Sequence, residues 1–112
     1  MQLLVLVLNQ VEKLEDLLKG FINKGITGAT IINSTGMIRE LASHMEHQPI
    51  FGSPWINIDP DRKESRTIFI ALNAKEVETA RAVIHEVIGD ISKPDTAVLF
   101  TVPIIYSEGI EK

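Results

Sequence analysis

The chain opens with an unbroken aliphatic run and then changes its hydrophobic period. Residues 2–8 are apolar at almost every position, too short a run for a buried helix and typical of a buried strand. From Gln10 onward, apolar residues recur at steps of three and four while charged residues fill the opposite side, which predicts an amphipathic helix that ends near Gly25. The apolar positions of that helix are Val11, Leu14, Leu17, Leu18, Phe21 and Ile22. Ala29 to Ser34, "ATIINS", is predicted to be a second short strand.

The same order of elements then recurs in the second half. Arg66 to Asn73, "RTIFIALN", parallels the opening "LLVLVLN" down to its Leu-Asn end, and Glu76 to Ile88 predicts a second amphipathic helix. A last strand follows from Ala97 to Ile104. Two β-α-β units in one chain predict an α+β, ferredoxin-like βαββαβ fold, in which two helices cover one face of a four-stranded antiparallel sheet.

The predicted strands are apolar on both faces, although one helix layer covers only one face. An exposed apolar sheet face would exceed the few hundred Å² that soluble monomers usually show. The pattern therefore predicts an oligomer whose copies cover the second face.

A long connection, residues 35–65, separates the two halves of what we interpret as a single domain spanning residues 1–112. Connections of this length inside a small domain are uncommon and usually functional. Within it, "MIRELASHMEH" predicts a short helix and "PWINI" predicts a strand.

Composition narrows the function classes. The net charge is -4, which argues against a nucleic-acid binder, and the absence of cysteine excludes disulfides and thiolate chemistry. No apolar stretch approaches the roughly 20 residues of a membrane helix, and the first apolar run lacks the basic flank of a signal peptide. These features predict a soluble, cytoplasmic protein without membrane insertion.

Candidate chemistry is sparse. His44 and His47 have a spacing that would suit two metal ligands on a helix, but no third ligand converges in the sequence, so solvated histidines are favoured over a metal site. The mixed-sign stretch at residues 59–66 is typical of a solvated surface, although its arginines could hold a phosphate. Because nothing reads as a catalytic set, we expect a non-enzyme.

Two stretches carry a family resemblance. "GITGATIINSTGM", after the first predicted helix, and "DTAVLFTVPI", near the end, resemble the PII-like signalling proteins, which are related to the nitrogen-regulatory PII family. The resemblance spans about residues 2–104. It implies a trimer with adenine nucleotides (ATP, ADP or AMP) as regulatory rather than obligatory ligands in clefts between subunits. It also implies that a loop, the T-loop, engages a target protein.

The resemblance implies a set of site residues. It places Thr30 near the adenine, and Gly36, Met37 and Arg39 at the base of the T-loop. The family's phosphate-binding loop would comprise Asp95, Thr96, Ala97 and Val98.

The chain also departs from the family pattern. Ala97 and Val98 stand where a glycine-rich loop would end in a lysine, and no arginine follows Ile105. Residues 35–65 contain no tyrosine for the family's regulatory modification. These departures argue against the usual ATP mode and leave a shifted, weaker or different nucleotide mode open.

The single tryptophan lies in the T-loop-like stretch. In "PWINI", period-two alternation would put Trp55 and Asn57 on one side, with Pro54 stiffening the chain before them. Three interpretations are open: a plug for the protein's own core, an anchor for a protein contact, or a lid over a base. We expect Pro54, Trp55 and Asn57 to contact a partner, because tryptophan is enriched at interface hot spots.

Two functions from different classes follow. The first is a non-enzymatic, ligand-sensing trimer that regulates a target protein through residues 35–65. The second is a trimeric interaction or self-assembly module with a vestigial nucleotide site, since Pro54-Trp55 and Ala97 would suit an altered or engineered variant. The CutA family shares the expected fold and trimer, but its loop motifs fit this chain less well.

Overall fold

The computed structural model describes residues 1–44 and 64–110. Its elements, in chain order, are β1 (Gln2–Leu8), the 3-10 turn η1 (Val11–Lys13), α1 (Leu14–Asn23), β2 (Thr30–Ser34), α2 (Met37–His44), β3 (Ser65–Leu72), α3 (Ala74–Ile88) and β4 (Ala97–Pro103). The strands form one four-stranded sheet in the order β2-β3-β1-β4, and every neighbouring pair is antiparallel.

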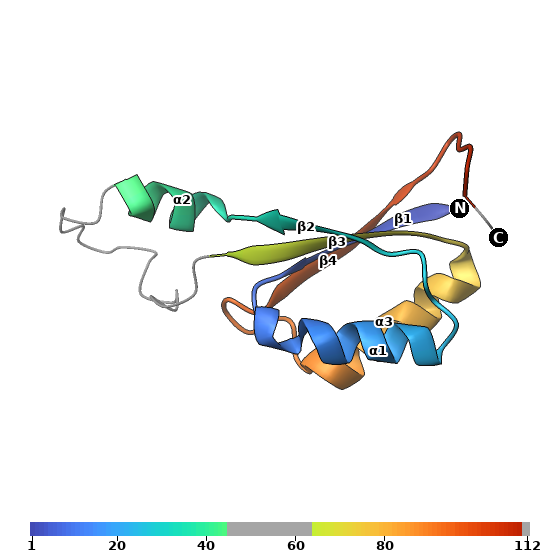
Figure 1. Cartoon of the computed structure of the whole chain (residues 1–112), viewed down its shortest axis with the longest axis horizontal. Helices are drawn as coiled ribbons and strands as arrows, with labels where there is room; N and C mark the ends of the chain where they lie inside the picture. Colours follow the sequence, from blue (N-terminus) through green and yellow to red (C-terminus); the bar gives the residue numbers. More distant parts are fainter. Residues whose placement is uncertain (45–63, 111–112) are drawn as a thin grey trace.

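The fold has two layers. Helices α1 and α3 lie side by side on one face of the sheet, whereas α2 extends beyond the end of the sheet (Figure 1). This arrangement confirms the predicted α+β class with a four-stranded antiparallel sheet, and it is compatible with a ferredoxin-like fold. Strands distant in sequence pair in the middle, because β1 lies between β3 and β4.

Most predicted element boundaries are confirmed to within three residues. The first helix begins as a 3-10 turn, and the chain reverses at Gly25, whose φ of +82° is readily available to glycine. The predicted boundary at Asn73 was wrong: β3 ends at Leu72, and Asn73 is the N-cap of α3. Its side chain accepts a hydrogen bond from the Glu76 backbone N–H while the Glu76 side chain accepts one from the Asn73 backbone, which forms a capping box.

The strand expected in "PWINI" lies outside the described residues, as does the end of the helix expected at residues 37–47.

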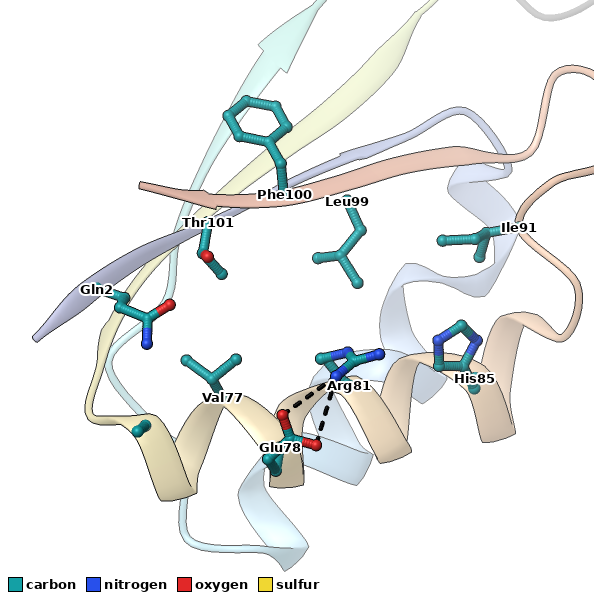
Figure 2. A pocket seen from close by; sticks show the side chains of 10 residues that line it. Gln2, Val77, Glu78, Arg81, His85, Ile91, Leu99, Phe100 and Thr101 are labelled. Atoms are coloured by element: carbon teal, nitrogen blue, oxygen red, sulfur yellow. Dashed lines mark hydrogen bonds and ion pairs between the residues drawn. The ribbon is translucent and has the colours of Figure 1, made fainter. Parts of the chain in front are cut away.

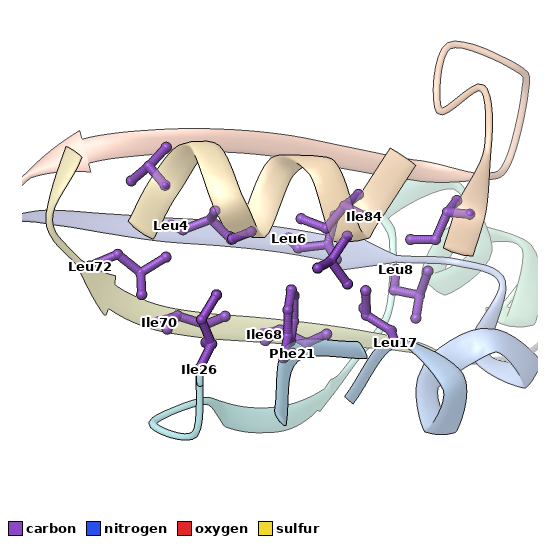
Figure 3. Packing of buried hydrophobic residues seen from close by; sticks show 14 of the residues in the cluster. Leu4, Leu6, Leu8, Leu17, Phe21, Ile26, Ile68, Ile70, Leu72 and Ile84 are labelled. Atoms are coloured by element: carbon purple, nitrogen blue, oxygen red, sulfur yellow. The ribbon is translucent and has the colours of Figure 1, made fainter. Parts of the chain in front are cut away.

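The core lies between the two helices and the sheet. Alternate residues of β1 and β3 point toward α1 and α3, and Figure 3 shows them packed with helix residues. The fully buried members include Leu4, Leu6, Leu8, Leu17, Phe21, Ile68, Ile70, Leu72 and Ile84. This side of the sheet and the two amphipathic helices account for the hydrophobic periods in the sequence.

The two helices approach each other closely at Gly20. A Cβ atom added there would lie 2.7 Å from Val83 Cγ1 and 3.8 Å from Val87 Cγ2. The glycine therefore allows α1 and α3 to pack at a separation that a larger residue would prevent.

Gly20→Ala is expected to destabilise the protein by about 1 kcal/mol, because overpacking costs about 1–3 kcal/mol and alanine returns about 1 kcal/mol of helix propensity. Denaturant unfolding would measure the difference. Gly28→Ala is the matched control, because nothing lies within 4 Å of a Cβ there and no left-handed φ is required. An unfolding free energy for Gly20→Ala equal to or above that of the unmodified protein would contradict the close approach.

The other face of the sheet has no described helix against it (Figure 1). The strand register puts Thr30, Phe69, Val5 and Phe100 in one row across this face, and Ile32, Thr67, Val7 and Val98 in the next. We call these two rows, together with Leu3, Ala71 and Val102, the open face. Several of its apolar members are exposed in the single chain, among them Ile32, Val98, Phe100 and Val102.

Candidate functional site

Polar side chains gather at one end of the sheet. Here β1 and β2 end while β3 and β4 begin, because Leu8 pairs with both Arg66 and Ala97, and Ser34 pairs with Ser65. Antiparallel pairing thus brings the base of the long insertion and the loop before β4 to the same end of the molecule.

The central feature of this end is an ion pair between Arg39 and Asp95. Arg39 Nη2 lies 2.5 Å from Asp95 Oδ2, and the two side chains are only 9% and 13% exposed. Arg39 comes from the first turn of α2, and Asp95 from the loop before β4. Two segments far apart in sequence are therefore joined by a buried, charge-assisted hydrogen bond.

Arg39 is not fully satisfied by this bond. Its Nε atom is buried and has no hydrogen-bond partner in the described part of the chain. Buried donors in native structures are nearly always bonded, so such an atom calls for an explanation, such as a water or a ligand. Among the described residues, the Arg39 guanidinium group is the strongest candidate for contact with an anion.

The loop that carries Asp95 is held by several hydrogen bonds. The Thr96 carbonyl accepts from the backbone N–H groups of Asn9 and Gln10, at 3.0 and 3.4 Å, and Thr96 Oγ1 donates to the Pro94 carbonyl. Asp95 itself has a φ of +57°, a left-handed conformation that aspartate tolerates better than most residues. The carboxylate is thus presented by a loop with a defined shape.

The start of the same loop has a turn of its own. Asp90 Oδ1 accepts hydrogen bonds from the Ser92 side chain and backbone, and the side-chain bond is the main reason that the pKa of Asp90 is lowered. Asp90 therefore stays ionised under ordinary conditions. At the C-terminal end, the hydrogen bond that Tyr106 donates to Glu108 raises the pKa of the tyrosine.

Hydroxyl groups continue the polar end onto the open face. Ser34 Oγ and Thr67 Oγ1 lie 2.7 Å apart, and Ser65 Oγ donates to Asn9 Oδ1 at 2.6 Å. Gln10 Oε1, next along the chain, is buried and has no hydrogen-bond partner within residues 1–44 and 64–110. This end of the sheet therefore offers hydrogen-bonding groups beside the ion pair.

The residues named from the family resemblance are only partly brought together. Arg39, Asp95 and Thr96 lie in the cluster, and Gly36 accepts a backbone hydrogen bond from Glu40 in the first turn of α2. Met37 begins α2 and is exposed. Ala97 and Val98 both belong to β4, as the hydrophobic pattern predicted, and not to a loop, as the family resemblance implied. Their role as ligand-binding residues stays a prediction.

Thr30 stands apart from the cluster within one chain. It lies opposite Phe69 on the open face, four positions before Ser34, which is roughly 13 Å along an extended strand. A ligand that contacts both Thr30 and the Arg39 cluster would have to span much of β2, or use a Thr30 from another copy of the chain.

The expected partner contacts Pro54, Trp55 and Asn57 lie outside the described residues, as does His47. In the described part of the chain, no group of three or more His, Cys, Asp and Glu side chains is arranged to hold a metal ion. Across residues 1–44 and 64–110, no helix has both the length and the apolar character needed to cross a membrane.

Two surface hollows lie away from the cluster. One lies between α3 and β4, where Leu99 and Thr101 point toward Arg81 and His85 while Phe100 points the other way (Figure 2). Arg81 is paired with Glu78 there, at 3.1 Å, and both side chains are exposed. The other hollow lies by the Gly25–Gly28 turn and the N-terminus of α3. Neither includes Arg39 or Asp95.

Sequence reasoning named Arg39 and Asp95 separately but did not predict that they pair, and it missed Asn9, Gln10 and Ser65. One signal was present for Asn9: it ends the first "LLVLVLN" as Asn73 ends "RTIFIALN". The two asparagines nevertheless act differently, since Asn73 caps α3 while Asn9 accepts a hydrogen bond from Ser65.

Comparison with known proteins supports the fold class. The chain is similar in structure to a functionally unknown protein from Pediococcus pentosaceus ATCC 25745, with a TM-score of 0.63 and 14% sequence identity. The match covers 97% of this chain and 96% of that one, so the whole architecture is shared. No protein-family model matches the sequence, and neither does any curated protein. At this identity, the structural likeness concerns the fold alone.

Proposed function

We propose that this protein is a non-enzymatic, PII-like signalling protein that assembles as a trimer and senses an adenine nucleotide. The observation that carries the proposal is the Arg39–Asp95 contact. The family resemblance placed Arg39 at the base of the T-loop and Asp95 in the phosphate-binding loop, and these two segments meet at one end of the sheet. The protein would be cytoplasmic.

The open face supports the trimer. Each of its two rows crosses all four strands and consists of Val, Ile or Phe side chains except for one threonine, and several of the apolar side chains are exposed in the single chain. Packing copies of the chain against one another on this face would bury on the order of 1,000 Å² or more per contact, the scale of a stable interface. A trimer would also create clefts between subunits, where Thr30 of one copy and Arg39 of another could meet.

The ligand-sensing role rests on the buried guanidinium. Arg39 has a buried Nε with no partner in the described chain, and guanidinium groups bind phosphoryl oxygens through paired hydrogen bonds. Residues 35–65, which include Arg39, would then carry the contact with the target protein. Pro54, Trp55 and Asn57 are the proposed contacts.

A second function is a trimeric interaction or self-assembly module with a vestigial nucleotide site, natural or engineered. The observation that favours it is the pair Ala97 and Val98, which begin β4 where the family's glycine-rich loop would end in a phosphate-binding lysine. Under this alternative, the Arg39–Asp95 pair would be purely structural.

Calorimetric titration with ATP, ADP, AMP and cyclic AMP, with and without magnesium, separates the two functions. If a nucleotide binds, Arg39→Ala should weaken binding by about 1.5–3 kcal/mol, the range for hydrogen bonds to charged groups. Thermal melting of the variant would first establish that it is folded.

Arg81→Ala is the matched control, since Arg81 is an exposed arginine paired with a carboxylate at the other hollow. If Arg39→Ala binds the nucleotide with unchanged affinity, or if only Arg81→Ala loses affinity, the nucleotide binds at a site other than the one proposed. An absence of binding at millimolar nucleotide would favour the assembly module.

A further inference from the structure

We infer that Asp95 is an internal competitor for the anion site of Arg39, so that a phosphoryl ligand binds by displacing the carboxylate and thereby releases α2. The inference rests on the proposed ligand-sensing function and adds the regulation of that site. It follows from three features: the geometry at Arg39, the rigidity of the loop that carries Asp95, and the position of α2.

In the Arg39–Asp95 contact, one hydrogen-bond donor of the guanidinium group is left without an acceptor among the described residues. The contact with Asp95 Oδ2 is made through Nη2, while Nε is buried and unpartnered among the described residues. A guanidinium group binds a planar or tetrahedral anion best through two parallel hydrogen bonds. A phosphoryl group that bonds to Nε and one terminal nitrogen would therefore satisfy the donor that Asp95 leaves without a partner.

Hydrogen bonds hold the loop that carries Asp95 to the rest of the domain. Thr96 binds the chain that follows β1, and Asp90 and Ser92 form a turn earlier in the same loop. When the Arg39–Asp95 ion pair breaks, we therefore expect the loop to keep its position. The change should therefore fall mainly on the arginine and on the helix that carries it.

The buried ion pair is the main contact between α2 and the rest of the domain among residues 1–44 and 64–110. Helix α2 extends past the end of the sheet (Figure 1), and it makes no extensive packing contact with another described helix or strand. The buried ion pair thus ties α2, which begins the long insertion, to the body of the protein. Occupation of Arg39 by a ligand would loosen this tie and change how the insertion is presented to a target.

Ligand binding at Arg39 and the release of α2 are linked equilibria, so their coupling is reciprocal. If ligand binding releases α2, any change that releases α2 must strengthen ligand binding. Apparent affinity falls in proportion to the fraction of molecules in the competent state. If the displaced state is about one tenth populated, removal of the Asp95 carboxylate should tighten binding by about tenfold.

The test compares Asp95→Asn with the unmodified protein by calorimetry, using ATP and inorganic tripolyphosphate as probes. Asp95→Gly is a second variant that also removes the carboxylate and readily adopts the left-handed φ at this position. Glu78→Gln, which makes the same chemical change in an exposed ion pair on α3, is the control. We expect about tenfold tighter binding of each probe in both Asp95 variants and unchanged binding in Glu78→Gln. When Arg39→Ala is combined with either Asp95 substitution, the increase in affinity should disappear.

Hydrogen exchange supplies a readout that does not need a ligand. Amides of residues 37–44 should exchange faster in Asp95→Asn, and faster in the unmodified protein when tripolyphosphate is bound, while those of α3 stay unchanged. Equal exchange of α2 in every state would overturn the release of the helix.

The outcomes separate this inference from the proposed function. If ATP binds the unmodified protein and the Asp95 variants equally, Asp95 does not compete and the nucleotide function stands. If tripolyphosphate binds the Asp95 variants more tightly than the unmodified protein, Asp95 does compete for the anion site. If ATP then binds no better than tripolyphosphate, the adenine is not recognised and the proposed nucleotide sensing is wrong. If neither probe binds any of the proteins, both are wrong.

Discussion

If the protein forms the proposed trimer, Phe100→Asp is expected to convert it into a monomer. Phe100 is 46% exposed in the single chain and stands at the β4 end of the row that crosses the open face through Val5 and Phe69. In a trimer that packs on this face, each new carboxylate would be buried without a partner, at a cost of several kcal/mol per ion. Since 1.4 kcal/mol is a factor of ten, the dissociation constant should rise by at least about a hundredfold.

Light scattering at micromolar concentration measures this directly, by comparing the mass of each variant with the 12.5 kDa mass of one chain. Thr101→Asp is the matched control: Thr101 is the next residue of β4, it is exposed, and its side chain points to the opposite side of the strand (Figure 2). The unmodified protein and Thr101→Asp should have three times the mass of one chain. A monomeric unmodified protein, or a trimeric Phe100→Asp variant, would be incompatible with assembly through the open face.

Phe21→Ala should remove a large part of the stability of the fold. Phe21 is 2% exposed and is the largest fully buried side chain among residues 1–44 and 64–110, on the side of α1 that faces the sheet (Figure 3). Truncation of a buried aromatic residue to alanine typically costs about 3–5 kcal/mol, through lost apolar burial and the cavity left behind. Domains of this size are commonly stable by only about 5–15 kcal/mol, so the variant should be close to unfolding at moderate temperature.

Denaturant unfolding at a fixed protein concentration is the appropriate measurement, because assembly would add to the apparent stability. Ile22→Ala is the control, since Ile22 is the next residue of α1 and is 61% exposed. It should change the unfolding free energy by no more than about 0.5 kcal/mol, the usual range for surface positions. Similar losses in the two variants would mean that the burial assigned to Phe21 is wrong.

The fold could be predicted from the sequence because its hydrophobic periods are unambiguous. The period of three to four around Leu17 and Phe21 and the aliphatic runs of β1 and β3 each match the element that forms there. The error at Asn73 has a physical reason. A polar residue after an apolar strand is compatible both with the last strand position and with a helix N-cap, and only the capping box with Glu76 decides between them.

The candidate site could be predicted only in part. Arg39 lies in α2 and Asp95 in the loop before β4, so their contact depends on the sheet order and on the path of α2, neither of which has a local signal in the sequence. For Ala97 and Val98, the family resemblance implied a loop while the hydrophobic pattern predicted a strand, and the strand is the element that forms. Their small, apolar side chains suit the first residues of a strand, with Ala97 on the core side and Val98 on the open face.

The pairing of β2 with β3 has a consequence for how this protein can change. Ser34 and Ser65 close the connection that runs through residues 35–64, so the ends of that connection are held by strand hydrogen bonds whatever lies between them. In general, each doubling of a loop's length adds only about 0.6 kcal/mol to the free-energy cost of closing it. Insertions and deletions between residues 45 and 63 should therefore be inexpensive for the sheet, and a new recognition sequence could be installed there while the core of the domain is kept.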